Sequence, residues 1–304
     1  MSAPIPWEYR SNCRVPDGCE LPAGLHRVAA VVEYDGSRFC GWQRQTHCAS
    51  VQQEVETALS RIADEPVTVS CAGRTDTGVH ATAQVIHFDT GARRAPHNWL
   101  LGANAQLPRS IRLQWAQDVD AGFHARFSAL ARTYRYVIHN ADRDPALLRD
   151  QVGRERRPLD VRAMESAGQL LLGERDFSAF RGAGCQSQSP RRNLIALHLW
   201  SQAQFVIIEI TANAFLLHMV RNIVGALCAV GRGERPLRWI AELLASRDRS
   251  AGAATAAPTG LYLVGVHYPP RFAVPALVGG PCFVAGTALL SRVNVLAQRR
   301  EAHW

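Results

Sequence analysis

The stretch "VTVSCAGRTDTGVHATAQVIHFD", residues 67–89, joins two apolar runs through a polar loop. Apolar and β-branched residues are frequent at 67–71 and 82–89, so we predict a strand on each side of a loop at 74–80. The loop carries Arg74 and Asp76, and an aspartate before Thr-Gly is also typical of an ordinary turn. Because a nearby arginine keeps a carboxylate ionised, the same loop fits a chemical role in which Asp76 is a nucleophile.

The residues before and after this stretch extend a pattern of alternating strands and helices. The run at 26–36 is apolar and ends in Asp-Gly, which predicts a strand followed by a turn. Ser50 precedes apolar residues at helical spacing, and Gln53 stands at the partner position of a capping box, so a helix is expected to begin there. A helix near 96–106 and a strand at 111–117 complete a first unit.

The second half of the chain continues the alternation without a clear repeat of sequence. The pattern predicts strands at 133–139, 194–200, 204–211 and 261–268, and helices at 159–173, about 213–230 and 236–245. Each unit therefore follows the order β-α-β-β-α-β, which indicates an α+β fold of two similar α/β halves of the ferredoxin or RRM type, with antiparallel sheets. We accordingly expect an N-terminal extension at 1–25, halves at 26–130 and 131–272, and a C-terminal tail at 273–304.

The charge of the chain favours an anionic partner. The formal net charge is +8, and all 34 basic residues are arginine. Such an excess points first to nucleic acid. The absence of lysine excludes Schiff-base chemistry and a GxxxxGK[ST] phosphate loop, and the sequence contains no GxGxxG either.

The cysteines do not form a recognisable metal or disulfide framework. They are Cys13, Cys19, Cys40, Cys48, Cys71, Cys185, Cys228 and Cys282. None forms a CxxC pair and no Cys/His set has zinc spacing, so we predict no metal site and free thiols in a reducing cytoplasm. The N-terminus lacks the apolar core of a signal peptide, and the longest apolar stretch, 214–230, is short and carries charge, so we expect no membrane segment.

A narrow polar stripe runs along the apolar helix expected at about 213–230. It consists of His218, Arg221, Asn222 and Gly225, at spacings of three and four residues. The stripe faces either water or a cleft. In the second case Arg221 needs an anionic partner, and Asp76 is available for that role.

Tyr134 and Tyr136 share one face of the strand at 133–139, with Arg132 and Arg135 beside them. Both tyrosines fit ordinary core packing. They also fit a platform on which a nucleic-acid base stacks while the arginines bind phosphates.

Six ordered blocks give the chain a resemblance to a known family. They are "EYDGSRFCGWQRQ", "CAGRTDTGVHATAQVIHF", "FHARFSALARTYRY", "DFSAFR", "NAFLLHMVRNIVG" and "GLYLVGVHYP". This series resembles the tRNA pseudouridine synthases of the TruA family from about His26 to Pro270. One departure is Thr77, which stands where the family usually has alanine, and its small hydroxyl leaves the aspartate unchanged.

The resemblance implies an activity and an assembly. Members of the family convert uridine to pseudouridine at positions 38, 39 and 40 of the tRNA anticodon stem-loop. They need no cofactor and no essential metal, and they are homodimers. Each subunit has two similar halves around a central basic cleft, so the same is expected of this chain.

The resemblance also implies roles for individual residues. Asp76 matches the catalytic aspartate, and Arg221 matches an arginine of the same catalytic site. Tyr134 and Leu261 match residues of the uracil pocket. Arg74 and Arg126, the latter in the "FHARF" part of its block, are expected to contact the tRNA; these assignments are given by the resemblance alone.

Two other classes of function fit the residues. The first is an RNA-binding module without chemistry, which would have stacking aromatics and no nucleophile loop. The second is a nucleoside hydrolase or nucleic-acid glycosylase that uses the same carboxylate, and such enzymes usually need a metal or a second acidic group to activate water. Neither is evident near Asp76 in the local sequence.

Overall fold

The computed structural model describes residues 21–276 and 279–284 of the 304-residue chain. Most of the expected N-terminal extension at 1–25 and of the expected tail at 273–304 therefore lies outside the described residues. No helix within the described ranges is long and apolar enough to cross a membrane.

The first unit has the predicted order of strands and helices. Its elements are β1 (His26–Tyr34), α1 (Val51–Ala63), β2 (Ser70–Cys71), β3 (His80–Thr90), α2 (Pro96–Gln106) and β4 (Ile111–Val119). Ser50 caps α1, since its side chain accepts a hydrogen bond from the backbone N–H of Gln53. The predicted helix start is therefore confirmed.

The second unit follows the same order with three short additions. Its elements are β5 (Ala131–Asn140), β6 (Gly153–Glu155), α3 (Val161–Gln169), β7 (Gly173–Asp176), β8 (Arg191–Gln202), β9 (Phe205–Ala212), α4 (Met219–Gly231), α5 (Trp239–Ser246) and β10 (Leu261–His267). The sequence pattern missed the short strands β6 and β7. It also placed the start of α4 six residues too early, because His218 adopts a left-handed conformation (φ 58°) that ends the preceding turn.

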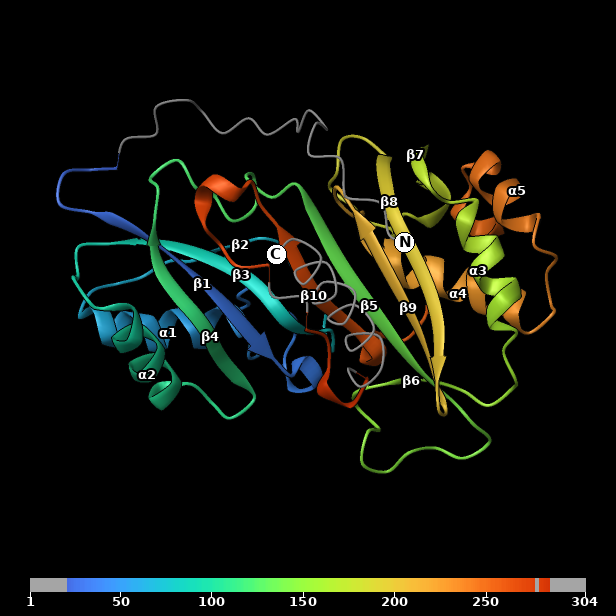
Figure 1. Ribbon diagram of the computed structural model, residues 1–304, viewed down its shortest axis with the longest axis horizontal. Coiled ribbons are helices and arrows are strands. Elements are labelled where there is room, and N and C mark those ends of the chain that lie inside the picture. The colour runs from blue at the N-terminus through green and yellow to red at the C-terminus, as the bar shows by residue number, and fades with distance from the viewer. Residues whose placement is uncertain (1–20, 277–278, 285–304) are drawn as a thin grey trace, which may run out of the picture.

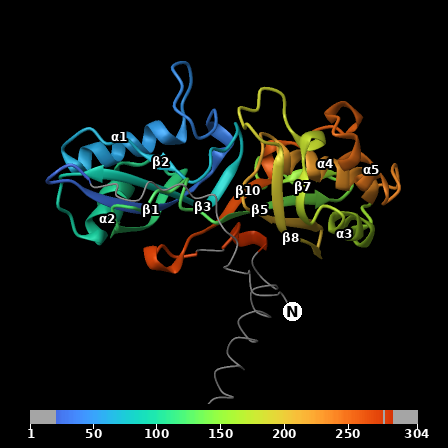
Figure 2. The ribbon, with the colours of Figure 1, turned by 90° about the horizontal axis from the view of Figure 1, so that it is seen from above.

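The two units share one sheet with the order β4-β1-β3-β10-β5-β9-β8-β7, while β2 pairs with β3 and β6 with β5. Neighbouring strands are antiparallel except at β10–β3 and β5–β6. The last strand of the second unit thus lies between the two units, with Tyr262 opposite His80 and Leu263 opposite Tyr134. Figures 1 and 2 show α1 and α2 at one end of this sheet and α3, α4 and α5 at the other. The predicted α+β class is confirmed, and the two expected half-sheets are continuous through β10.

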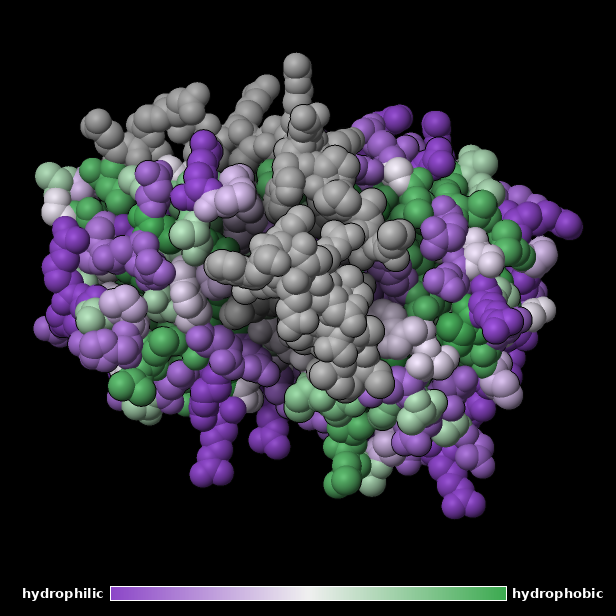
Figure 3. All heavy atoms as spheres, in the orientation of Figure 1, coloured by the Kyte–Doolittle hydropathy of each residue, from purple (hydrophilic) through white to green (hydrophobic). Residues whose placement is uncertain are grey.

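The core lies between the sheet and the helices. Its largest fully buried side chains include Trp42, Trp99, Phe88, Phe123 and Phe177. Figure 3 shows hydrophilic residues spread over both ends of the face seen in Figure 1, which is the usual division between a packed interior and a solvated surface.

The prediction of free thiols is wrong for one pair of cysteines. Cys40 and Cys48 are joined by a disulfide, with their Cα atoms 6.2 Å apart, whereas the other four described cysteines are free. The loop between β1 and α1 folds back on itself and brings the two residues together, which spacing alone does not reveal. Cys13 and Cys19 lie outside the described residues.

Candidate active site

A cavity of about 710 Å³ lies where the two units meet. Its lining includes all six residues that the sequence suggested for a site, namely Arg74, Asp76, Arg126, Tyr134, Arg221 and Leu261. Among the described residues that line it, Asp76 is the one acidic side chain. Residues from β5, from α4 and from the loop between β2 and β3 therefore converge on a single carboxylate.

The loop that carries Asp76 is fastened to β3 by a buried glutamine. Gln84, on β3, is fully buried, and its Nε2 donates to the carbonyl of Gly73 at 2.6 Å while its Oε1 accepts from the N–H of Gly73 at 3.4 Å. The backbone N–H of Ala72 also donates to Val85 O at 2.8 Å. These bonds fix the first half of the loop against a central strand of the sheet.

The second half of the loop is held from the β1–α1 side. Trp42 N–H donates to the carbonyl of Thr75 at 3.0 Å, and the hydroxyls of Tyr34 and Thr75 lie 2.8 Å apart. Gly41 has φ 86°, and a Cβ there would lie 2.6 Å from Thr75 O and 3.0 Å from the carbonyl carbon of Asp76. Only glycine permits this approach, so close packing of the Gly41 backbone helps to fix Asp76, together with the turn in which the Asp76 carbonyl accepts from Val79 N–H at 3.1 Å.

Asp76 pairs with Arg221 across the cavity. Arg221 Nη1 lies 3.2 Å from Asp76 Oδ2, with 14% of the arginine side chain and 28% of the aspartate side chain exposed. Arg221 Nε donates to the carbonyl of Ala256 at 2.8 Å, which holds the guanidinium in place. The cleft-facing alternative for the polar stripe is therefore correct, and the water-facing one is wrong.

Asn222 and Gly225 of the stripe pack against protein rather than water, whereas the His218 side chain is partly exposed. Asn222 is buried, donates to Phe180 O at 2.8 Å and accepts from Thr255 at 2.7 Å. A Cβ added to Gly225 would lie 2.1 Å from Ala254 O. The segment that precedes β10 thus packs directly on α4 and holds Arg221 toward the cavity.

Tyr134 and Tyr136 differ in what they contact. Tyr134 lines the cavity, and its ring meets Phe215 edge to face with ring centroids 5.0 Å apart. Burial, and next the negative charge of Asp76, raise the pKa of its hydroxyl above the ordinary value. Tyr136 is buried beyond the cavity and donates to Ala257 O at 2.9 Å. The shared face that the sequence predicted therefore contains one cavity residue and one core residue.

Arginines give the cavity wall its positive charge. Arg74, Arg126, Arg132 and Arg192 line it, and none of them lies within ion-pair distance of a carboxylate in the described part of the chain. Arg132 instead donates to the carbonyls of Ala72, Arg126, Ala129 and Asn213, and burial lowers its pKa. The predicted basic cleft between the units is thus present, and it is open to an anionic ligand.

The sequence placed His218 in the polar stripe without indicating a role for it, and it singled out neither Phe215 of the cavity nor Gln84, which fastens the Asp76 loop. His218 Nε2 lies 3.4 Å from Asp76 Oδ2, and Phe215 packs on Tyr134. Both residues lie in the "NAFLLHMVRN" segment, within six residues of Arg221. Their proximity to Arg221 in the sequence was the feature that could have indicated them. Nothing in the sequence singles out Gln84, because a glutamine within an apolar strand does not by itself indicate that its side chain hydrogen-bonds a neighbouring loop. The described residues contain no group of three or more histidine, cysteine or acidic side chains arranged to hold a metal.

The sequence of the chain is similar to those of known proteins. The sequence model of the tRNA pseudouridine synthase family matches residues 30–128 and 167–269. A tRNA pseudouridine synthase A of Aeromonas salmonicida is 53% identical over 262 residues, which cover 86% of this chain and 97% of the relative. One of Coxiella burnetii is 51% identical over 260 residues, which cover 86% and 100%.

Solved structures give only a distant likeness. An H/ACA ribonucleoprotein bound to a substrate RNA that contains 2′-deoxyuridine aligns with a TM-score of 0.31 and 10% identity, over 66% of this chain and 44% of that one. A likeness at this level defines neither fold nor function.

Proposed function

The chain belongs to the tRNA pseudouridine synthase family and is an isomerase acting on tRNA, and from this premise we propose that it modifies positions 38, 39 and 40 of the anticodon stem-loop. We propose Asp76 as its nucleophile. The observation that carries this assignment is that, among the described residues lining the cavity, Asp76 is the one carboxylate, it is paired with Arg221, and the other charged side chains are basic.

The reaction is an isomerisation, so its atoms balance without a cofactor. The N1–C1′ bond breaks, the uracil turns, and C5 bonds to C1′. The carboxylate of Asp76 serves this reaction by adding to the uracil ring or to C1′, or by taking a proton in an elimination route. The detached base must also be kept from water, and buried strands and α4 around Asp76 provide that shielding.

The other cavity residues have roles that follow from their chemistry. Arg221 keeps Asp76 ionised and oriented. The displaced uracil, whose removal from the stack costs roughly a few kcal/mol, lies against the Tyr134 ring and Leu261. Arg74 and Arg126 bind the tRNA backbone near the displaced nucleotide, because free guanidinium groups suit phosphate oxygens.

Two alternatives remain as outcomes of the test. A binding module without chemistry would leave tRNA unchanged. A glycosylase would release free uracil, but it would need a second acidic group to activate water, and none accompanies Asp76 among the described residues of the cavity.

Three further features belong to the same proposal. The chain acts as a homodimer in the cytoplasm, where its tRNA substrate is. Its halves meet between residues 130 and 131, and the N-terminal extension at 1–25 and the C-terminal tail at 273–304 lie outside the two catalytic halves. The support for these features is the family resemblance together with the order of the elements.

The direct test is incubation of unmodified tRNA with the purified protein, followed by mapping of pseudouridine along the anticodon arm. We expect pseudouridine at positions 38 to 40 and none in a matched tRNA with cytidine at those positions. Modification elsewhere would contradict the proposed site on tRNA. Release of free uracil would support the glycosylase, and binding without any change in the RNA would support the binding module.

A further inference from the structure

His218 is the N-cap residue of α4 and has an unusual backbone conformation. It is the residue before the first helical turn, and its backbone is left-handed at φ 58° and ψ 5°. Residues with a Cβ rarely adopt this conformation, and they cluster at functional sites when they do. The ring does not cap the helix, since the side chain makes no capping hydrogen bond. Its carbonyl accepts the N–H of Asn222 at 2.9 Å, so the backbone of His218 starts the helix while the ring is left free of that task.

The surrounding backbone aims the ring at the cavity. A Cβ on Gly182 would lie 3.0 Å from His218 Nδ1 and 2.9 Å from the carbonyl of Leu217. Gly182 N–H donates to that carbonyl at 2.7 Å, so the loop at residue 182 packs directly against the turn that contains His218. Nδ1 faces this backbone, whereas Nε2 lies 3.4 Å from Asp76 Oδ2, and 36% of the side chain is exposed.

The proposed reaction needs a group that moves a proton. Uridine has a hydrogen on C5 and none on N1, whereas pseudouridine has a hydrogen on N1 and none on C5. One group that accepts a proton and then returns it meets both needs. Tyr134 is unsuited, because it is buried and its raised pKa keeps the hydroxyl protonated. Asp76 is engaged as the nucleophile and paired with Arg221.

We propose that His218 is the proton carrier of this reaction. The inference rests on the proposed function and extends it to a residue that was assigned no role there. Nε2 is the ring atom next to the reacting carboxylate, and histidine is the side chain that changes charge between about pH 5 and 8.

The step balances as follows. After C5 has bonded to C1′, C5 carries one hydrogen and the ring has a double bond between N1 and C6. The neutral imidazole takes the C5 proton on Nε2, and the electron pair of the C–H bond forms the C5–C6 double bond. N1 receives the displaced pair as negative charge and then takes a proton from the imidazolium. His218 returns to its neutral form, and nothing is consumed.

The charges around His218 suit a transient imidazolium. Asp76 on the loop before β3 favours the cation, while Arg221 on α4 and the positive N-terminal end of that helix oppose it. Cys185, whose Sγ accepts from Leu217 N–H at 3.5 Å, and Arg181, which donates to the Cys185 carbonyl, face the same turn from the segment before β8. Asp76 is therefore the carboxylate that faces the ring, and Arg221 shares that carboxylate.

Two variants test the inference by single-turnover pseudouridine formation across pH 5 to 9. His218→Asn suits the left-handed backbone, since asparagine adopts it readily. His218→Gly suits it fully and leaves room for free imidazole. We expect both to bind tRNA and to melt like the wild type, yet to react at least tenfold more slowly. The wild-type rate should fall as the pH drops and the imidazole becomes charged, and this fall between pH 5 and 8 should disappear in His218→Asn. Added imidazole should restore rate to His218→Gly.

The matched control is His198→Asn, on β8, which does not line the cavity. It should retain the wild-type rate and pH profile. A rate for either His218 variant within twofold of the wild type would overturn the inference, and so would a slow variant that keeps the wild-type acid limb. If the wild-type protein itself forms no pseudouridine, the proposed function fails, which is a different result from an active enzyme that does not need His218.

Discussion

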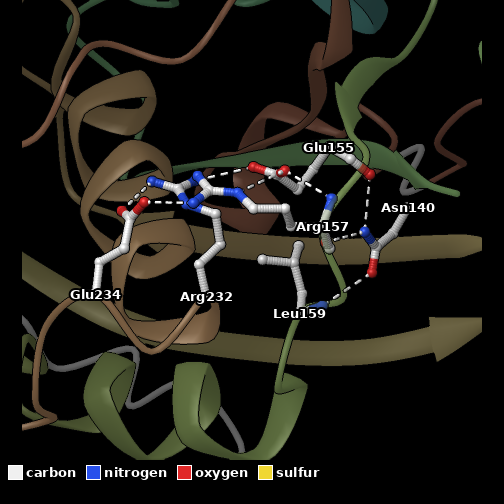
Figure 4. A network of polar contacts seen from close by, with 6 residues as sticks. All are labelled: Asn140, Glu155, Arg157, Leu159, Arg232 and Glu234. Atoms are coloured by element: carbon white, nitrogen blue, oxygen red, sulfur yellow. Dashed lines mark hydrogen bonds and ion pairs between the residues drawn. The ribbon is translucent and has the colours of Figure 1, made fainter. Parts of the chain in front are cut away.

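Two arginines on one helix have opposite settings. Arg221, in the first turns of α4, has one carboxylate partner among the described residues, Asp76, which opens onto the cavity. Arg232, just beyond the last turn, lies between Glu155 at 2.9 Å and Glu234 at 2.7 Å (Figure 4). Arg221 thus pairs with a carboxylate that remains accessible to a ligand. Arg232 instead pairs with two carboxylates, Glu155 and Glu234, which both also pair with Arg157.

The network around Arg232 continues into the backbone. Asn140 Nδ2 donates to the carbonyls of Glu155 and Arg157, and its Oδ1 accepts from Leu159 N–H (Figure 4). These contacts fasten the segment before α3 to the end of β5. The comparison teaches that an ion pair does not identify a site by itself; what distinguishes the cavity pair is that its carboxylate keeps a free side toward a cavity lined by positive charge.

The largest effect is expected at the carboxylate of the cavity pair. Asp76→Asn keeps the shape and loses the nucleophile, so turnover should fall on the order of a thousandfold or more while tRNA affinity is retained. Single-turnover rates and tRNA binding measured on the same preparation check this. Turnover near the wild-type rate would remove Asp76 from its central role.

Matched changes at the two arginines test the comparison directly. Arg221→Gln should slow the reaction on the order of a hundredfold, because Asp76 loses the group that orients it. Arg232→Gln should leave the rate unchanged and lower the free energy of unfolding by about 1–2 kcal/mol, because charge-assisted hydrogen bonds are lost.

Single-turnover rates and urea denaturation of both variants test whether Arg221 affects the reaction and Arg232 affects stability. If the two changes had the same profile, with equal losses of rate or equal losses of stability, the distinction between the two ends of α4 would be untenable.

The two tyrosines of β5 provide a smaller contrast of the same kind. Tyr134→Leu removes the stacking face and should weaken tRNA binding by about 1–3 kcal/mol. Tyr134→Phe should retain both binding and rate, since the hydroxyl is not the proton carrier. Tyr136→Phe loses the hydrogen bond to Ala257 and should cost about 1 kcal/mol of stability with no change in rate. Equal catalytic losses at both positions, with both folds intact, would refute the assignment of Tyr134 to the pocket.

The smallest expected effect is on the thermal stability of the protein at acidic pH. Hydrogen bonds from Arg232 and then Arg157 lower the pKa of Glu234 from its ordinary value near 4.5 to about 2. A lowered carboxyl pKa stabilises the fold above the ordinary value and loses that contribution as the pH falls toward about 2. The melting temperature of Arg232→Gln should therefore approach that of the wild type between pH 5 and 2. A constant difference across this range would show that the Glu234 pair adds nothing to stability.

Local sequence patterns predicted most of the helices and strands, but not where each one ends or which elements pack against each other. Period-two and helical spacing identified the strands, the helices and the cap at Ser50. They misplaced the start of α4, because the left-handed turn at His218 depends on the contact with Gly182, and the "NAFLLH" residues are as apolar as a helix. They also missed the Cys40–Cys48 disulfide, which arises from the path of a loop.

The sequence by itself determined the α+β class, the order of the longer elements in both units, the family and the residue types of the site. Only the tertiary structure decided that Asp76 meets Arg221, 145 residues away, and that His218 is the third member of the group. Strand periodicity did not separate Tyr134 from Tyr136; the family resemblance assigned Tyr134 to the pocket, and Tyr134 does line the cavity. The physical reason is that periodicity records which face of a strand or helix is buried, and nothing more. The cavity exists because β10 pairs with both β3 and β5, and that pairing depends on contacts between residues far apart in the chain.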